Sequence, residues 1–306
     1  MRKSHVISLF ILFIVVTVLI LSQAFTGPGS DTTLNGPTRS PVTAPPTSTK
    51  KPTPTATVAP KPTPIVKPQI DLSKYAGLSQ SATWWYTSMV RDAANPDKVT
   101  YYPDPAAAKL IEGTDCFYER SQGEGKEIYL TFKLGYFNYE TEILDTLKAA
   151  NVRATFFVPA NYLTLNAGNK EKAATVLKRI VEEGHTFAAR DVIPKTTVTP
   201  EQFCDNLWTV TELYQQYAGD TKQVEYYFPD QLTELNIALV EAMGSKVSLF
   251  SFSVGGEDAS TTILNNMVKN TADGSILSLS TSKNQSAALK DYISQMQTKG
   301  YTFNAL

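Results

Sequence analysis

Histidine and cysteine are scarce in this chain of 306 residues, which contains two of each. His5 lies near the N-terminus and His185 lies in the second half of the chain. Because His5 lies beside an N-terminal apolar run with nearly the length of a membrane span, one copy of the chain cannot build a metal centre on both histidines. Cys116 and Cys204 are too few and too far apart to form a disulfide framework, and whether they pair is left open.

Bulky apolar residues are almost absent from residues 26–68, which are rich in Thr, Pro, Ser and Lys. Such a composition cannot bury enough apolar surface to offset the entropy that is lost on ordering. We therefore predict a disordered linker over residues 26–68, kept extended by its prolines.

Residues 1–25 are different, because Arg2 and Lys3 precede an uncharged apolar run over residues 6–22. The 17 residues of this run are slightly few for the ~30 Å hydrocarbon core of a bilayer, but more than a typical signal peptide needs. Positive charge before the run places the N-terminus in the cytoplasm. We predict an extracytoplasmic protein held by a single-pass membrane anchor. A cleaved signal peptide, which would leave a secreted protein, is the alternative.

Positive charge is concentrated in this same N-terminal part of the chain. Residues 1–68 contain seven Lys or Arg and one Asp, a net charge of +6. The whole chain carries −1, so residues 69–306 carry −7. An acidic folded part argues against nucleic acid as a partner.

From residue 127 onward, short apolar runs alternate with segments of helical character. The expected strands cover residues 127–132, 153–158, 186–188, 224–228, 247–251, 275–279 and 301–303. The expected helices cover residues 139–150, 171–183, 200–217, 232–243, 261–270 and 285–299. This order predicts an α/β domain over residues 127–306, with a mainly parallel sheet closed into a distorted (β/α) barrel. A functional site would lie at the carboxyl ends of the strands.

Residues 69–126 form a separate stretch in which aromatic residues such as Trp84, Trp85, Tyr101 and Tyr102 are frequent. Because the stretch is hard to divide into helices and strands, we predict an irregular extension packed on the barrel. Aromatic rings that pack against the barrel are the simpler interpretation. Exposed rings that stack on sugars are the alternative.

A short motif closes the apolar run of the first expected barrel strand. From Thr131 to Tyr136 it reads Thr-Phe-Lys-Leu-Gly-Tyr. It resembles the signature Thr-Phe-Asp-Asp-Gly-Tyr of the polysaccharide deacetylases, the carbohydrate esterases related to nodulation protein B. In that family the first Asp is the catalytic base and the second is a metal ligand. The resemblance implies that Lys133 and Leu134 stand in their places.

The resemblance continues through later motifs to the end of the chain. The family's second motif supplies two metal-ligating histidines, and the aligned positions hold Arg190 and Pro194. Its third motif supplies an arginine that orients a catalytic carboxylate, and Phe228 is aligned with it. Its last motif supplies the histidine that acts as general acid, where Ser280 stands. The closing residues 299–303 are similar to the type that acts on peptidoglycan N-acetylmuramic acid.

The resemblance implies a zinc-dependent hydrolase that removes acetyl groups from amide nitrogens, but with its ligands, base and acid replaced. We therefore expect no cofactor and a catalytically inactive cell-surface protein that binds peptidoglycan, another wall glycan or a protein partner. One alternative is an active N-deacetylase of peptidoglycan or chitin-type polymers, a hydrolase of non-peptide C–N bonds with an altered site. Another is a purely structural wall protein. The residues expected to line the pocket are Lys133, Tyr136, Arg190, Asp191, Phe228, Asp230 and Ser280.

Other catalytic arrangements are weakly supported by the sequence. Ser280 could act as a nucleophile only with His185 as its base. Asp191, Asp230 and Glu257 could in principle form a glycosidase-type pair. An all-carboxylate calcium or magnesium site is formally possible, but no cluster with suitable spacing is visible.

Two cations, Lys133 and Arg190, occupy aligned positions of the former active site. Buried and unpaired, each would cost several kcal/mol. We predict that one of them bonds Asp191 or Asp230 and so fills the former metal position. The alternative is that both side chains extend into solvent.

Overall fold

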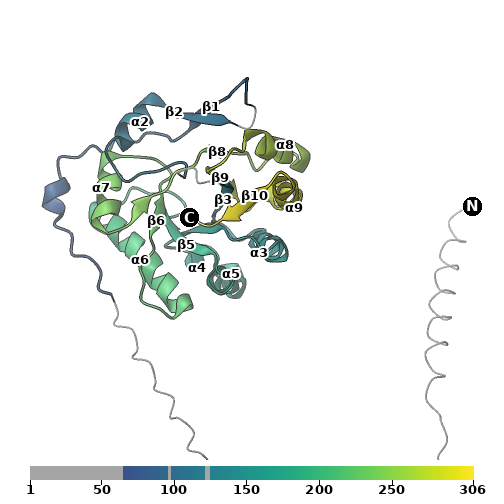
Figure 1. Ribbon diagram of the computed structural model, residues 1–306. Helices are drawn as coiled ribbons and strands as arrows, with labels where there is room; N and C mark the ends of the chain where they lie inside the picture. Colours follow the sequence, from purple (N-terminus) through teal and green to yellow (C-terminus); the bar gives the residue numbers. More distant parts are fainter. Residues whose placement is uncertain (1–64, 96–97, 121–124) are drawn as a thin grey trace, which may run out of the picture. The chain divides into compact units, whose positions relative to one another are not determined.

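The computed structural model describes residues 65–95, 98–120 and 125–306, which belong to one compact unit (Figure 1). The expected membrane anchor over residues 1–25 and most of the expected linker over residues 26–68 lie outside this part of the chain. Within the described residues, no helix is both long enough and apolar enough to cross a bilayer.

Eight strands form a curled, parallel sheet with helices on its outer side (Figure 1). Its order is β7-β6-β5-β4-β3-β9-β8, and β10 pairs with the first half of β3. The strands are β3 (Lys126–Lys133), β4 (Thr155–Pro159), β5 (Thr186–Arg190), β6 (Tyr226–Phe228), β7 (Lys246–Val247), β8 (Phe252–Ser253), β9 (Ser275–Ser280) and β10 (Tyr301–Asn304). The predicted distorted (β/α) barrel is confirmed.

The helices that cover the sheet begin and end close to the predicted positions. They are α3 (Glu140–Ala149), α4 (Tyr162–Leu165), α5 (Lys170–Glu182), α6 (Pro200–Ala218), α7 (Glu234–Ala242), α8 (Ser260–Asn270) and α9 (Lys283–Thr298). All but the short α4 were expected, and their ends lie within two residues of the prediction. Capping explains part of this agreement. Thr199 and Gln202 form a reciprocal capping box at the start of α6, and Gly300 takes a left-handed φ of 83° after α9.

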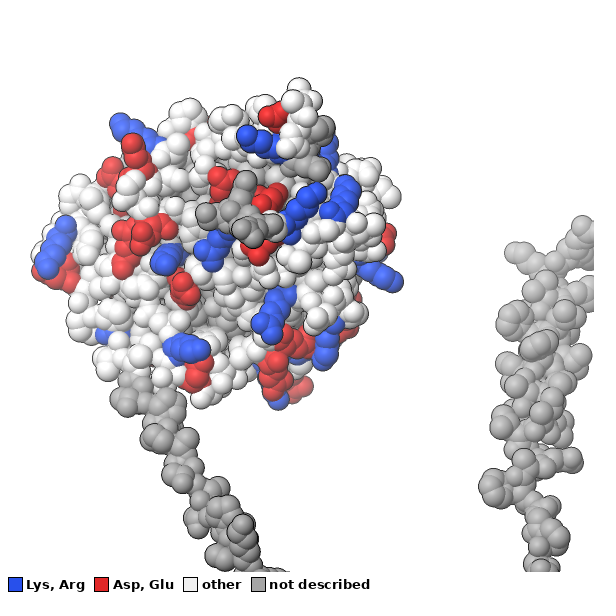
Figure 2. Space-filling model, viewed as in Figure 1, with Lys and Arg blue, Asp and Glu red and all other residues white. Residues whose placement is uncertain are grey.

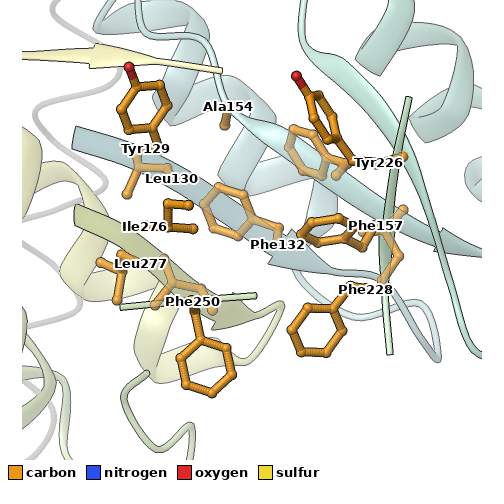
Figure 3. Close-up of a cluster of buried hydrophobic side chains, with 14 of the residues drawn as sticks. Tyr129, Leu130, Phe132, Ala154, Phe157, Tyr226, Phe228, Phe250, Ile276 and Leu277 are labelled. Atoms are coloured by element: carbon orange, nitrogen blue, oxygen red, sulfur yellow. The ribbon is translucent and has the colours of Figure 1, made fainter. Parts of the chain in front are cut away.

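Aromatic side chains pack on both faces of the curled sheet (Figure 3). Phe132 on β3 stacks on Phe156 of β4, with ring centroids 5.2 Å apart. Phe157 packs on Phe228 at 5.4 Å, and Phe228 stacks on Phe250 at 6.1 Å. All five rings are buried. Phe132 and Phe156 lie on the face of the sheet that the helices cover, whereas Phe157, Phe228 and Phe250 pack on the inner face, beneath the site.

The strand predicted over residues 247–251 is wrong in its extent. The structure has two short strands instead, β7 and β8, which pair with opposite ends of the sheet. Between them the chain crosses the gap between β7 and β8, the two edges of the curled sheet, which we call the seam of the barrel. There the Leu249 N–H bonds the carbonyl of Phe117 at 2.8 Å and the Ser251 N–H bonds the carbonyl of Ile276 at 2.9 Å. Hydrogen bonds to two different segments therefore take the place of the single strand ladder that the prediction implied.

The predicted irregular extension, residues 69–126, contains regular structure. It holds the 3₁₀ turn η1 (Leu72–Tyr75), the antiparallel hairpin β1 (Thr87–Arg91) and β2 (Val99–Pro103), and the helix α2 (Pro105–Ile111). Trp85 Nε1 donates to the carbonyl of Phe250 at 2.9 Å, and Tyr101 Oη lies 2.6 Å from Ser275 Oγ. The extension therefore packs along the seam between β7 and β8.

Neither cysteine forms a disulfide in the structure. Cys116 is half-buried in the extension and Cys204 is buried in α6.

Figure 2 shows acidic and basic side chains interspersed on the face in view, so no extended surface of one sign lies there.

Candidate functional site

The aligned motif residues gather at the carboxyl ends of neighbouring strands. In the sheet register, Lys133 at the end of β3 pairs with Ser280 at the end of β9. Arg190 at the end of β5 pairs with Phe228 at the end of β6. Between them, β4 pairs with both β3 and β5. The parallel sheet thus brings four motif positions, far apart in sequence, to one end of the barrel.

Arg190 joins two of the former motifs. Its Nη1 donates to the carbonyl of Leu134 at 3.0 Å, and its Nη2 donates to Asp230 Oδ1 at 2.8 Å. The side chains of Arg190 and Asp230 are 10% and 26% exposed. The predicted bond between a cation and an acid at this end of the barrel is therefore confirmed.

Asp191, the other acid considered as a partner, is used differently. Its Oδ2 accepts the backbone N–H of Asp230 at 2.8 Å, and its Oδ1 accepts the hydroxyl of Tyr227. Burial and then the adjacent Asp191 raise the pKa of Tyr227 well above its usual value. Because both acids already hold partners, they are poorly suited to act as a glycosidase pair.

Lys133 lies over aromatic rings. Its Nζ is 5.2 Å from the ring centroid of Phe228 and 6.0 Å from that of Phe250. These two rings meet below the end of the barrel (Figure 3). Burial, followed by repulsion from Arg190, lowers the pKa of Lys133, and attraction to Asp230 opposes that shift. Cation–π attraction to these two rings therefore stabilises the charged form of the Lys133 amine.

Ser280 is held by α9 and by the loop after β8. Its Oγ donates to Gln285 Oε1 at 2.6 Å, and its backbone N–H donates to the same oxygen at 2.8 Å. Gln285 Nε2 donates to the carbonyl of Val254 at 2.8 Å. A side chain at Gly256 would bring a Cβ within 3.1 Å of Ser280 Oγ. The position of the expected general acid is thus filled by a closed hydrogen-bond network.

His185 cannot serve Ser280 as a base. It lies directly before β5, at the opposite end of the parallel strands from Ser280. Its Nδ1 accepts the backbone N–H of Ala154 at 3.2 Å, and its side chain is 1% exposed. The structure therefore contradicts a Ser280–His185 nucleophile pair.

The three aligned ligand positions do not fit a zinc ion. Leu134 is fully buried and offers no donor side chain, Arg190 is a cation, and Pro194 is exposed and has no donor atom. Over residues 65–95, 98–120 and 125–306, no three His, Cys, Asp or Glu residues form a group that could hold a metal. The carboxylates therefore form no calcium or magnesium centre within these residues either.

A cavity of about 230 Å³ opens beside Arg190 and Asp191, between the starts of α6 and α7. Gln80, Lys195 and Gln231 also line it, and Lys195 Nζ donates to Gln231 Oε1 at 2.6 Å. Tyr136 is 63% exposed in the loop after β3. The motifs gave no signal for Gln80, Tyr227 or Gln285, because these residues reach the site from the extension, a strand interior and a helix.

Comparison with known proteins gives a consistent family. A family model described as polysaccharide deacetylase matches residues 120–272. An uncharacterised 30.6 kDa protein of Geobacillus stearothermophilus is 31% identical over 212 residues, which cover 65% of this chain and 76% of that protein. The peptidoglycan-N-acetylmuramic acid deacetylase PdaA of Bacillus subtilis is 29% identical over 225 residues, covering 68% of this chain and 81% of PdaA.

Solved structures agree with the fold. The structure of Bacillus subtilis PdaA, a family 4 carbohydrate esterase, matches with a TM-score of 0.63 and 26% identity over 74% of this chain and 96% of that chain. A family 4 pseudoenzyme from Bacillus anthracis matches with a TM-score of 0.54 and 16% identity over 62% of this chain and 67% of that chain. At that identity, the second likeness shows the fold alone.

Proposed function

Because the chain belongs to the polysaccharide deacetylase family, we propose that it is a catalytically inactive member that binds peptidoglycan or another wall glycan at the cell surface. Arg190 is the observation that carries this proposal. Its guanidinium stands where the family resemblance expects a ligand histidine, and it is bonded to Leu134 and Asp230. A fixed cation repels a divalent metal and provides no lone pair for it.

The other aligned positions support the same proposal. Where the family has a carboxylate as the base, this chain has the half-buried amine of Lys133, which lies over two aromatic rings. A general acid must reach the leaving amine, but the hydroxyl of Ser280 is bonded to Gln285. No described residue at this end of the barrel replaces either group in a hydrogen-bonded catalytic pair.

Glycan binding is supported by the family and by the shape of this end of the barrel. PdaA is a deacetylase of peptidoglycan N-acetylmuramic acid. The cavity beside Arg190 and the exposed ring of Tyr136 offer polar and aromatic surface to a sugar chain. We propose that the chain retains the family's affinity for wall glycan without its chemistry.

The rival function is an active N-deacetylase with an altered site, and metal content separates the two. We expect the purified protein to hold no stoichiometric zinc and to release no acetate from muramic-acid-containing or chitin-type oligomers when zinc is added. We also expect it to cosediment with purified peptidoglycan. Tightly held zinc together with acetate release would establish the rival function, and failure to cosediment would refute the glycan partner.

Partial repair of the first motif is expected to leave the protein inactive. Lys133→Asp with Leu134→Asp restores the family residues at two positions only. The other aligned positions, Arg190, Pro194, Phe228 and Ser280, still lack the family chemistry. The measurement is zinc-dependent acetate release compared with the parent chain. Because Leu134 is fully buried, thermal unfolding is recorded first, and Lys133→Asp alone serves as the milder variant. Any zinc-dependent acetate release by either variant would refute our account of the site.

We also propose surface display on a single-pass anchor, which rests on the sequence of residues 1–68. Protease added to intact wall-less cells is expected to cut within residues 26–68 and release the barrel into the medium. A cytoplasmic protein serves as the lysis control. Protection of the barrel from protease would reverse the proposed orientation, and its presence in the medium before protease is added would favour the cleaved signal.

A further inference from the structure

Large exposed side chains gather on one face of the β1–β2 hairpin. Trp84, Tyr86 and Tyr102 are 64%, 56% and 51% exposed, and Val90 is similar. Apart from Ile65 and Val66 at the start of the described chain, only Tyr136 joins them among exposed large apolar side chains of the described residues. We call the outward side chains of Trp84, Tyr86, Ser88, Val90, Thr100, Tyr102 and Asp104 the hairpin face.

The backbone register places these rings on one side. Burial alternates without a break from residue 82 to residue 90, so the even-numbered side chains point outward. Ser88 pairs with Tyr102, and the Asp104 N–H bonds the carbonyl of Tyr86 at 3.1 Å. Tyr86 and Tyr102 are therefore diagonal neighbours, at a Cα spacing of roughly 7–8 Å. Tyr86 Oη also donates to Asp104 Oδ2 at 2.7 Å, which fixes the ring.

The opposite side of the hairpin holds it firmly on the barrel. Trp85 bonds the carbonyl of Phe250, and Thr87 Oγ1 bonds the carbonyl of Ser251. Tyr101 Oη donates to the carbonyl of Asn270 at 2.8 Å, and its ring stacks on Phe252 at 6.2 Å. The outward rings thus stand on a fixed support along β8 (Figure 1), and a ligand would not have to order them.

The hairpin face follows in sequence directly after residues that line the cavity beside Arg190. Thr83 and Leu232 exchange two backbone hydrogen bonds of 2.8 Å, and Leu232 follows Asp230 by two positions. Gln80 and Ala82 line the cavity that also contains Arg190. A polymer that extends from this cavity along the extension would therefore contact Trp84 first and then the rest of the hairpin face.

We propose that the hairpin face is a second glycan-binding surface, on which pyranose rings of a wall polysaccharide stack. Aromatic rings offer flat apolar area to the C–H faces of sugars, and Ser88, Thr100 and Asp104 offer hydrogen bonds to their hydroxyls. Asp104 is the only charged one of these seven side chains, and the exposed Lys98 that precedes Thr100 lies near Asp92. The face therefore lacks the cluster of cations that an anionic polymer or lipid surface requires. The inference rests on the proposed wall-glycan function, but it uses residues outside the matched range 120–272.

Binding of the full-length, detergent-solubilised protein to peptidoglycan glycan strands stripped of peptides tests this surface. Trp84→Ala with Tyr102→Ala should weaken the apparent dissociation constant by about tenfold or more, as loss of central aromatic anchors does elsewhere. Trp84→Phe with Tyr102→Phe should recover most of the affinity, because the rings remain. Val66→Ala, which removes an 83%-exposed side chain away from the hairpin, should leave it unchanged. Thermal unfolding of each variant confirms that it is folded.

The possible outcomes separate the two proposals. If the parent and the alanine variant bind the strands equally, the hairpin surface is refuted and the proposed function stands. If the parent binds no strands, both are refuted. If the alanine variant loses binding only to walls that still carry protein, the occupant is a protein and the glycan surface is refuted.

Discussion

Replacing Arg190 by alanine is expected to lower the free energy of unfolding by about 3 kcal/mol, measured by denaturant titration. The substitution removes the partner of Asp230, whose side chain is only 26% exposed, and leaves the carbonyl of Leu134 without this donor. Most of this loss comes from the Asp230 carboxylate and the Leu134 carbonyl, because each loses a charged hydrogen-bond donor at a partly buried position. The bonds of Arg190 are therefore expected to stabilise the altered site.

A double-mutant cycle isolates this contact. Asp230→Ala should also destabilise the protein, and the double variant should lose less than the two single losses combined, with a coupling of roughly 1 kcal/mol or more. Lys178→Ala is the matched control, because Lys178 and Glu182 form an ion pair with both side chains about 60% exposed. It should cost less than about 0.5 kcal/mol. Additive losses in the cycle would show that Arg190 and Asp230 do not stabilise each other.

The end of the barrel could be predicted largely from the order of the elements. Because a parallel β/α sheet puts all its carboxyl strand ends at one edge, Lys133, Arg190, Phe228 and Ser280 had to meet. The partner of Arg190 was narrowed to two acids, and the structure selects Asp230. That selection depends on Asp191 accepting the Asp230 N–H, a loop contact that no motif encodes.

Contacts between distant segments account for what the sequence did not predict. Residues 87–91 read Thr-Ser-Met-Val-Arg, without the apolar alternation that marks a half-buried strand, so β1 was not foreseen. The apolar run over 247–251 predicts one strand, although its backbone groups bond three different segments in turn, at Tyr227, Phe117 and Ile276. Gln285, in the first turn of α9, accepts the hydroxyl of Ser280, and the ring of Phe250, at the seam, lies 6.0 Å from Lys133 Nζ. Tertiary pairing decides such positions, and local pattern does not reveal it.

Acid is expected to destabilise the protein through His185. Burial lowers the pKa of His185 to about 4, with Arg179 and Arg153 acting in the same direction and Glu183 opposing them. In the unfolded chain the pKa is about 6.5. Between these values the unfolded state binds the extra proton, so stability is complete above pH 6.5 and falls as the pH is lowered toward 4. The loss attributable to this residue should be about 3 kcal/mol by pH 4.

The comparison of the parent with His185→Gln measures this loss directly. Glutamine removes the titration and can still offer an oxygen to the Ala154 N–H, which His185 Nδ1 now accepts. Lost packing against Phe156, whose ring lies 5.2 Å from the imidazole, lowers the variant's stability equally at every pH. Carboxylates titrate in both proteins and cancel in the difference. The stability difference between parent and variant should therefore be constant above pH 6.5 and shift by about 3 kcal/mol in the variant's favour by pH 4. A difference that stays constant from pH 7 to pH 4 would mean that His185 becomes protonated as easily in the folded protein as in the unfolded chain.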